Sequence, residues 1–537
     1  MTGLGVNIRQ VERTGTDQYV ITLAVPNVSA QSQVNGVASR KINVDSNYAT
    51  YRLNIGRDPF SKYALFTNHH FSDPTAESSC AGGGTGCRIT FTSNTVFSGP
   101  VHTNEVFNFQ DQPYFGGPVS SAGCGAGRIV ASATGDSCAA GGTTAGAYAS
   151  GTQFTNAATL NAAPNPLKPS ICSGSTCSTP QFSDSINWNA DFQQLPTNSN
   201  DQVGAAKAGG LYISGTVSNM TLAVSNIAPQ GGASQKAQLI TYNTGGVITN
   251  LATTADKKMY IQINGVWKPA VQLISTGAWV DASGAAAVAA VTANTNPLVP
   301  TFYNSFNGVV YADAPAGSDG IKNLNGPART STNSTNTSTS ANTLPSVADF
   351  AQLNVVSNGN VHITSDLTYE NPPCSGSNVV TGSGTSATFT PADCSNTTAT
   401  NILGVYSSAG DVLLDSQATH TPGMPKNVKI QAVLMASQGK VTVDGFDSTN
   451  KTGLGQVNLM GGIIENYYGA FFTTGGTGYT RNFVYDVRTS QGVMPPSFPT
   501  QKAWTSVITA GTQEKGTSKY PVTTIKLDGT QTQQKVQ

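Results

Sequence analysis

The residues most open to chemistry are eight cysteines, which occur along the chain as four pairs of close neighbours. Each pair flanks a stretch rich in Gly, Ser and Thr, and an even number of locally paired cysteines is typical of disulfides formed in an oxidising compartment. The predicted disulfides are Cys80–Cys87, Cys124–Cys138, Cys172–Cys177 and Cys374–Cys394. Zinc is the alternative, since the spacing of Cys172 and Cys177 is tolerable for a ligand pair. No second pair of Cys or His with finger-like spacing lies nearby, so we expect no metal and no cofactor.

Five histidines are the next candidates: His69, His70, His102, His362 and His420. His69 and His70 could bind a metal, but adjacent residues of a strand point to opposite faces, which makes joint chelation awkward. We therefore expect structural packing or a surface turn at this pair. His102 and His362 each follow a valine of an expected strand, which predicts that both side chains face outward.

No catalytic motif is found. The chain has no nucleophile elbow with partners, no phosphate-binding loop and no dinucleotide fingerprint. Its 28 acidic residues are thinly spread and show no cluster. Two carboxylates of the glycosidase kind need only be neighbours in space, so a β-helix enzyme acting on polysaccharides stays as an alternative. The expectation is a protein that is not an enzyme.

Basic residues are concentrated in three places, and some of them lie beside aromatic residues. Such groups can hold phosphates and stack on bases, although solvated strand faces produce the same pattern. The candidate DNA-binding residues are Lys257, Lys258, Lys268, Lys426, Lys429, Lys440, Lys451, Arg481 and Arg488.

The overall composition indicates an extracytoplasmic surface protein. Only 10% of the 537 residues are charged, against a usual value of about 25%, and Gly, Ser, Thr, Asn and Gln take their place. The chain is 38% apolar, which is typical of a folded protein. Basic and acidic residues number 28 each, so net charge gives no sign of a nucleic-acid partner. The longest apolar run, residues 285–291, is too short to span a bilayer, so a targeting segment, if the protein is exported, would be missing from this sequence.

Alternating apolar and polar residues predict a mainly β protein. Residues 7–58 are expected to form antiparallel strands, among them 19–25 and 49–55. Short strands that begin with Gly recur from about residue 88. Gly410 and Gly439 are 29 residues apart, and Gly359 and Gly410 are 51 apart, of which the cysteine loop 374–394 takes 21.

This regular spacing indicates the coils of one parallel β-solenoid, with the cysteine loop as an excursion from one coil. A β-sandwich with similar alternation is the alternative. Residues 330–343 are nearly all Ser, Thr and Asn, which predicts a flexible loop.

Two parts of the chain carry a family resemblance. The first comprises the motifs at residues 61–70, 97–105 and 120–124, and the second those at 461–486 and 495–500. Together they resemble the ComZ-like minor pilins of natural competence, over roughly residues 10–140 and 355–500. The resemblance implies a pilin-type antiparallel β-sheet with an inserted β-solenoid (parallel β-helix), and an N-terminal pilin helix that is absent from this sequence.

The resemblance also implies a role and a place. Such proteins sit at the tip of a type IV pilus on the bacterial surface, beside other pilins, and bind extracellular double-stranded DNA during uptake. The membrane would be reached only through the missing N-terminal helix. A pilus or surface-layer adhesin that binds glycans or surfaces is the alternative from another class.

The expected organisation has five parts. Residues 1–60 begin the pilin-like β-subdomain, 61–200 start the solenoid with its disulfide-closed loops, 201–350 form an inserted β-rich region, 351–470 continue the solenoid, and 471–537 return to the pilin-like subdomain.

Overall fold

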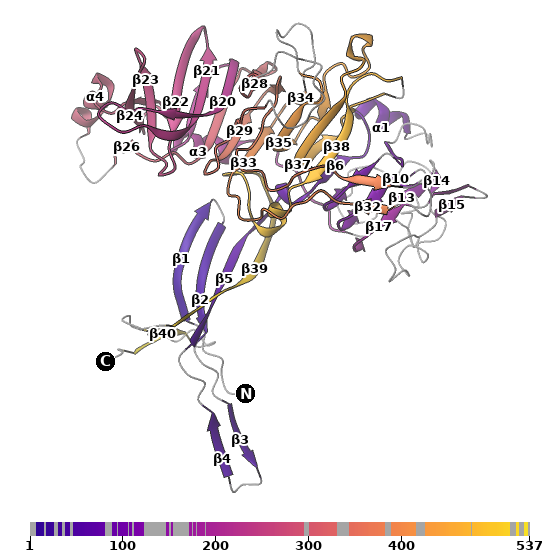
Figure 1. Cartoon of the computed structure of the whole chain (residues 1–537), viewed down its shortest axis with the longest axis horizontal. Helices are drawn as coiled ribbons and strands as arrows, with labels where there is room; N and C mark the ends of the chain where they lie inside the picture. Colours follow the sequence, from indigo (N-terminus) through magenta and orange to yellow (C-terminus); the bar gives the residue numbers. More distant parts are fainter. Residues whose placement is uncertain are drawn as a thin grey trace. The chain divides into compact units, whose positions relative to one another are not determined.

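The chain folds into two compact units, Met1–Asp58 with Thr500–Gln537, and Pro59–Pro499. Figure 1 shows the computed structural model of the chain. The structure describes residues 7–15, 18–25, 30–34, 38–42, 47–80, 89–93, 95–105, 107–109, 112–122, 147–149, 152–153, 171–173, 176–178, 180–187, 190–294, 300–329, 343–381, 388–414, 425–473, 475–515, 522–525 and 531–534.

The first unit is built around a four-stranded sheet whose order is β1, β2, β5, β39. These strands are β1 (Asn7–Gly15), β2 (Gln18–Val25), β5 (Asn47–Pro59) and β39 (Thr500–Lys515). β1, β2 and β5 are antiparallel, as the alternation within residues 7–58 predicts. Two hairpins complete the unit: β3 (Ala30–Val34) with β4 (Ala38–Ile42), and β40 (Val522–Ile525) with β41 (Gln531–Gln534).

The chain leaves this sheet after β5 and returns to it as β39, beside β5. The whole second unit is therefore inserted between two neighbouring strands of the first unit's sheet.

The second unit contains a sheet in which every neighbouring pair of strands is parallel. Its order is β18, β12, β9, β6, β37, β35, β33, β29, β27, β19, and β38 also pairs with β37. The strands are β6 (Leu65–His69), β9 (Val101–Thr103), β12 (Val119–Ser121), β18 (Ile186–Asn187), β19 (Leu211–Ser214), β27 (Val309–Asp313), β29 (Gln352–Ser357), β33 (Ile402–Ser407), β35 (Lys429–Ala436), β37 (Gln456–Tyr467) and β38 (Thr480–Tyr485).

A second sheet has a parallel part and an antiparallel extension. The parallel strands are β20 (Val217–Ile227), β28 (Asp319–Asn325), β30 (Asn360–Ile363), β34 (Val412–Leu414) and β36 (Val441–Val443). The extension consists of β21 (Gln235–Thr244), β22 (Val247–Thr253), β23 (Met259–Ile263), β24 (Val266–Leu273), β25 (Trp279–Asp281) and β26 (Phe302–Tyr303). Within residues 201–350, β19, β20, β27 and β28 thus extend the two parallel arrays, while β21–β26 add antiparallel strands.

The chain alternates between the two sheets. β27, β29, β33 and β35 of the first sheet are followed by β28, β30, β34 and β36 of the second, in the same spatial order (Figure 1). The mainly β class is confirmed, and the strands predicted after Gly359, Gly410 and Gly439 are β30, β34 and β36, which lie side by side.

The close approach of the segments that lead into β30, β34 and β36 explains the repeated glycines. A Cβ on Gly410 would lie 2.7 Å from the backbone nitrogen of Asn360 and 2.9 Å from the carbonyl carbon of Gly359. A Cβ on Gly439 would in turn lie 2.8 Å from the carbonyl carbon of Gly410. Only glycine allows the segments before these neighbouring strands to approach so closely.

The central strands of the first sheet are buried on both faces, which is usual for parallel strands. All residues of β33 are buried. Leu403 and Val405 belong to the main hydrophobic cluster, which also contains residues of the second sheet, whereas Tyr406 belongs to a separate cluster on the other face with Phe66 and Phe498.

Shorter elements surround these sheets. Three short parallel strands, β8 (Val96–Phe97), β11 (Tyr114–Phe115) and β17 (Gln181–Phe182), form one small sheet, and another contains β7 (Thr90–Phe91), β10 (Phe107–Phe109), β13 (Ala147–Ala149) and β14 (Thr152–Gln153). Two hairpins are β15 (Ile171–Ser173) with β16 (Thr176–Ser178), and β31 (Val379–Thr381) with β32 (Thr388–Thr390). The helices are α1 (Pro74–Cys80), α3 (Asn200–Lys207) and α4 (Ala285–Ala293), with 3-10 turns η1 (Phe60–Lys62), η3 (Thr449–Lys451) and η4 (Val487–Gln491). None of the helices in the described ranges is long and apolar enough to cross a bilayer.

One predicted disulfide is confirmed. Cys374 and Cys394 are bonded, and their side chains pack with Met460 and Val484 of β37 and β38. The backbone register of the β15–β16 hairpin sets Cys172 opposite Cys177. Of the remaining pairs, Cys87, Cys124 and Cys138 lie outside the described residues, as do His420 and residues 330–342 of the predicted flexible loop 330–343.

Candidate functional site

Two of the predicted DNA-contacting residues are buried, which corrects the sequence-based expectation. The Arg488 side chain is 0% exposed. Its Nε and Nη2 donate to the two carboxylate oxygens of Asp486 at 2.9 and 2.6 Å, and its Nη1 donates to the carbonyl oxygen of Ala399 at 2.8 Å. Lys451 is also buried and donates to the carbonyl oxygen of Asp444. Neither cation is available to a phosphate, because both serve as internal donors.

Arg481 lies beside two aromatic rings. Its guanidinium lies 5.1 Å from the ring centroid of Tyr468 and 5.3 Å from that of Phe471. Burial lowers the pKa of Arg481 to about 10, despite the opposing effect of the Glu465 carboxylate. The arginine therefore acts as a packing group within the fold.

Two of the remaining candidates have carboxylate partners. Lys258 Nζ lies 2.7 Å from Asp256 Oδ2, and Lys268 Nζ lies 2.9 Å from Asp281 Oδ2. Lys257 is exposed in the same turn as Lys258, between β22 and β23.

The other candidate lysines lie in another part of the second unit, around β35. Lys426 is exposed shortly before β35, Lys429 begins β35, and Lys440 follows its far end. Burial lowers the pKa of Lys429. The lysines predicted for DNA contact are thus separated along at least two regions of the second unit and do not form one patch.

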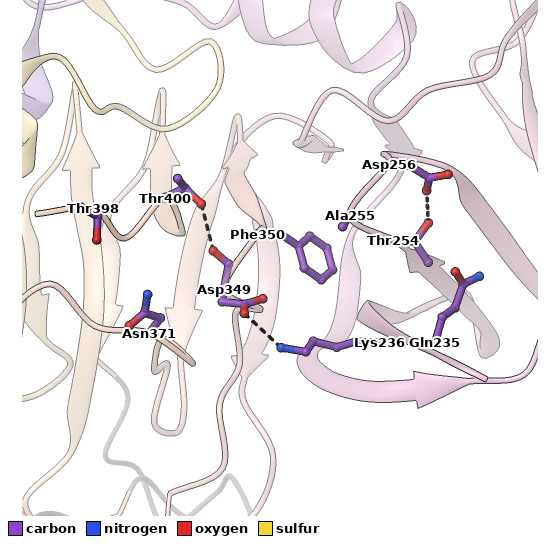
Figure 2. Close-up of a pocket in the computed structure, with 10 residues that line it drawn as sticks. All are labelled: Gln235, Lys236, Thr254, Ala255, Asp256, Asp349, Phe350, Asn371, Thr398 and Thr400. Carbon is purple, nitrogen blue, oxygen red and sulfur yellow. Dashed lines mark hydrogen bonds and ion pairs between the residues drawn. The ribbon is translucent and has the colours of Figure 1, made fainter. Parts of the chain in front are cut away.

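A groove with a volume of about 720 Å³ opens where the antiparallel extension meets the turns before β29 and β33 (Figure 2). It is lined by Gln235, Lys236, Thr254, Ala255, Asp256, Asp349, Phe350, Asn371, Thr398 and Thr400. Figure 2 shows the Phe350 ring lying between Asp349 and Ala255. The lining therefore combines one aromatic ring with hydroxyl, amide and carboxylate groups.

The charges around this groove are held in ion pairs. Lys236 Nζ lies 3.1 Å from Asp349 Oδ2 and 2.9 Å from Glu370 Oε1. These bonds raise the pKa of Lys236, so it stays protonated. Asp256, which also lines the groove, is paired with Lys258. Carboxylates outnumber cations here, which is unfavourable for a phosphate and compatible with a neutral polar ligand.

A row of hydroxyl and amide side chains crosses the second sheet. The register sets Thr221 opposite Asn325 and Thr241, and Thr241 opposite Asn250. Thr221 donates to Asn325 at 2.7 Å, Thr241 donates to Asn250 at 2.9 Å, and Asn250 donates to Gln262 at 3.1 Å. The row thus runs over β28, β20, β21, β22 and β23 with the spacing of neighbouring strands, about 4.8 Å.

The structure corrects the expectation that His102 faces outward, because this side chain is 1% exposed. Its Nδ1 lies 2.8 Å from Ser120 Oγ and its Nε2 lies 3.1 Å from Asn104 Oδ1. Burial lowers the pKa of His102 to about 4, and the charge of Lys62 acts in the same direction. His362 is half-buried, with its Nε2 3.1 Å from Asp319 Oδ1.

His69 and His70 point to different surroundings, as strand alternation predicts. The His70 ring packs edge-on against Phe91 at 4.9 Å. Nδ1 of His69 lies 3.3 Å from Glu77 Oε2 and 3.2 Å from Glu105 Oε1.

Burial alone would lower the pKa of His69, but the hydrogen bond to Glu105 and the charges of both carboxylates outweigh it and raise that pKa. Burial raises the pKa of Glu105. Sequence inspection missed this cluster because 28 residues separate the two glutamates and no motif links them.

The comparisons with known proteins give one partial match. A family model described as a domain of unknown function (DUF4900) matches residues 18–124, a segment that runs from β2 into the first parallel strands and contains the His69 cluster. No curated protein matches the chain significantly. No solved structure matches it significantly either.

Proposed function

We propose that this chain is the extracellular part of a ComZ-like minor pilin, in which a β-solenoid inserted into a pilin-type β-sheet is displayed at the tip of a type IV pilus. The observation that carries the proposal is the connection of the two units: the second unit leaves the first unit's sheet after β5 and returns as β39, next to β5. An insertion of this size would be difficult to fit within a packed filament shaft, which favours the tip.

The alternation between two sheets supports the solenoid within this proposal. Each turn from β27 to β36 adds one strand to each sheet, and stacked turns bury a continuous core. The Cys374–Cys394 disulfide supports an extracytoplasmic location, since such bonds persist in oxidising compartments.

The proposed role is the binding of extracellular double-stranded DNA for uptake in natural transformation, in a tip complex with other pilins. This role rests on the family resemblance. Of the candidate residues, the exposed lysines Lys257, Lys258 and Lys426 would contact phosphates, with Lys258 leaving its ion pair with Asp256. Contacts of this kind are insensitive to sequence and weaken with salt.

The test is a titration of the full chain with a labelled DNA duplex at several salt concentrations. Each phosphate contact contributes about −0.9 to the slope of log K for binding against log salt concentration, so three contacts predict a slope of about −3. The double charge reversal Lys257→Glu, Lys258→Glu should reduce both the affinity and the slope. Lys207→Glu, an exposed lysine on α3, is the matched control and should leave both nearly unchanged. Absence of binding at low salt, or a slope near zero, would exclude the DNA role.

A second function, adhesion through glycans, is favoured by the groove of Figure 2. One aromatic ring surrounded by amide, hydroxyl and carboxylate groups suits the apolar face and the hydroxyls of a sugar ring. Its excess of carboxylates is unfavourable for DNA. The amide and hydroxyl row over β28 to β23 offers a further neutral polar surface.

One set of measurements distinguishes the DNA-binding function from the adhesive function. An adhesin should retain neutral glycans with little dependence on salt, and Phe350→Ala should weaken that binding at least about tenfold while leaving any DNA binding intact. Phe472→Ala, which removes an exposed ring remote in sequence from the groove, serves as control. Glycan binding that is unaffected by Phe350→Ala would reject the groove as the adhesive site.

A further inference from the structure

We propose that His69, Glu77 and Glu105 form a binding site for one divalent transition-metal ion of the zinc type. Three elements supply the ligands: His69 ends β6, Glu77 lies in α1, and Glu105 follows β9. The candidate ligand atoms all lie within 4.8 Å of one another.

The two distances from His69 to the carboxylates fit a shared ion. Zinc binds imidazole nitrogen and carboxylate oxygen at about 2.0–2.2 Å with tetrahedral geometry, which places neighbouring ligand atoms roughly 3.3 Å apart. Nδ1 of His69 lies 3.3 Å from the Glu77 oxygen and 3.2 Å from the Glu105 oxygen. A ring nitrogen carries at most one hydrogen, so it cannot make a full hydrogen bond to both carboxylates. An ion between the three atoms would satisfy all of them.

The charge of the cluster also suits a divalent cation. Two carboxylates with a neutral imidazole carry a charge of −2, and their side chains are 17% and 3% exposed. Buried carboxylates need a compensating cation. Within the described part of the chain, neither glutamate forms an ion pair with a lysine or an arginine.

Neighbouring groups hold the ligands in place. The second oxygen of Glu105 accepts a hydrogen bond from the His70 backbone N–H at 2.7 Å. The Tyr467 hydroxyl donates to Glu77 Oε2 at 3.0 Å, and the Tyr467 ring stacks on His69 with centroids 4.5 Å apart and an interplanar angle of 9°. Such supporting bonds orient metal ligands and are a usual part of metal sites.

The ligand set selects the metal. One nitrogen and two carboxylate oxygens suit Zn²⁺, with Mn²⁺ weaker in the ordinary order of affinities. Calcium is disfavoured because it takes six to eight oxygen ligands. Glu77 is the most exposed of the three ligands, and zinc sites with three protein ligands commonly take water as the fourth. Bound to these residues, the ion would link α1 and the segment after β9 to the end of β6 and thereby stabilise this part of the parallel sheet.

The experiment is a calorimetric titration of the full chain with ZnCl₂ and MnCl₂. The protein is first dialysed against EDTA, and free thiols are alkylated so that cysteines cannot bind zinc. We expect one Zn²⁺ per chain, weaker binding of Mn²⁺, and a melting temperature that rises with Zn²⁺ and falls again with EDTA. Glu105→Gln should weaken Zn²⁺ binding at least about tenfold, since even changes to supporting groups cost that much.

Two further variants make the result decisive. Glu77→Gln alters the most exposed ligand and should fold even if Glu105→Gln does not, and it too should weaken binding. His362→Gln is the matched control, because it removes a histidine that lies beside the Asp319 carboxylate and outside the cluster, and it should leave Zn²⁺ binding unchanged. Absence of saturable Zn²⁺ binding, or equal binding by the wild type and the Glu77→Gln variant, would overturn the proposal.

Discussion

His102 is held neutral by its surroundings. Ser120 Oγ and Asn104 Oδ1 lie at hydrogen-bond distance from its two ring nitrogens, and the ring stacks on Phe66 with centroids 5.1 Å apart. A neutral imidazole satisfies both partners by accepting from the serine hydroxyl and donating to the amide oxygen. A proton added to this buried ring would have no counter-charge nearby, and Lys62 opposes it.

A pH dependence of stability follows from His102. Its pKa is about 4 in the folded protein and 6.5 when unperturbed, so between these values the unfolded chain binds the proton and the folded chain does not. Stability from this group is therefore complete above pH 6.5 and is lost as the pH falls toward 4, by about 3 kcal/mol in total. Urea unfolding at a series of pH values should show this loss, and His102→Gln should reduce it.

The half-buried His362 provides the control, since His362→Gln should keep the loss of stability between pH 6.5 and 4. In an NMR titration the His102 ring signals should stay constant down to about pH 5. Titration of these signals near 6.5 would contradict the buried, neutral state.

At the scale of elements, the glycines that precede β30, β34 and β36 set how closely these neighbouring strands approach one another. The Asn360 side chain accepts a hydrogen bond from the backbone N–H of Asp411 at 2.9 Å, and Val361 N–H donates to the Asp411 carbonyl at 2.9 Å. Gly410 lies directly beside these bonds. A side chain at this position would push apart the starts of β30 and β34, which these hydrogen bonds hold together.

Gly410→Ala is therefore expected to destabilise the second unit by about 1–3 kcal/mol, the usual cost of overpacking. Gly204→Ala is the matched control, because a Cβ there meets no atom within 4 Å and the residue lies within α3. That variant should be neutral or stabilising by up to about 1 kcal/mol. Urea unfolding measures both. Equal urea midpoints for Gly410→Ala and the wild type would mean that the segments before β30 and β34 do not approach each other this closely.

At the scale of the whole molecule, the inserted unit has its own core. Among the described residues, the two largest hydrophobic clusters are built from residues 60–498, and this unit is joined in sequence to β5 and β39 of the first unit's sheet. A domain with its own core is expected to fold when it is separated from its neighbour.

A fragment of residues 59–499 should therefore be soluble, form the Cys374–Cys394 bond and unfold cooperatively in urea. Circular dichroism and mass spectrometry with and without reductant measure these properties. A fragment that binds a hydrophobic dye and unfolds without a sigmoidal transition would show instead that the second unit depends on the first.

The sequence by itself determined the features that depend on near neighbours. Alternation in residues 19–25 and 49–55 predicted β2 and β5, and the spacing of Gly359, Gly410 and Gly439 predicted parallel strands in register. The Cys374–Cys394 bond was predictable for the same reason, since it closes a short loop. Periodicity and loop closure are local constraints, and they are visible in the order of the residues.

Only the tertiary structure decided which polar groups are buried and which of them meet. The sequence predicted Arg488 and His102 to be surface residues, yet each is buried and lies beside its hydrogen-bond partners. His69, Glu77 and Glu105 converge because β6 and β9 pair in parallel and α1 folds back toward the end of β6. The physical reason is that burial and convergence depend on contacts between distant turns, and no local pattern encodes them.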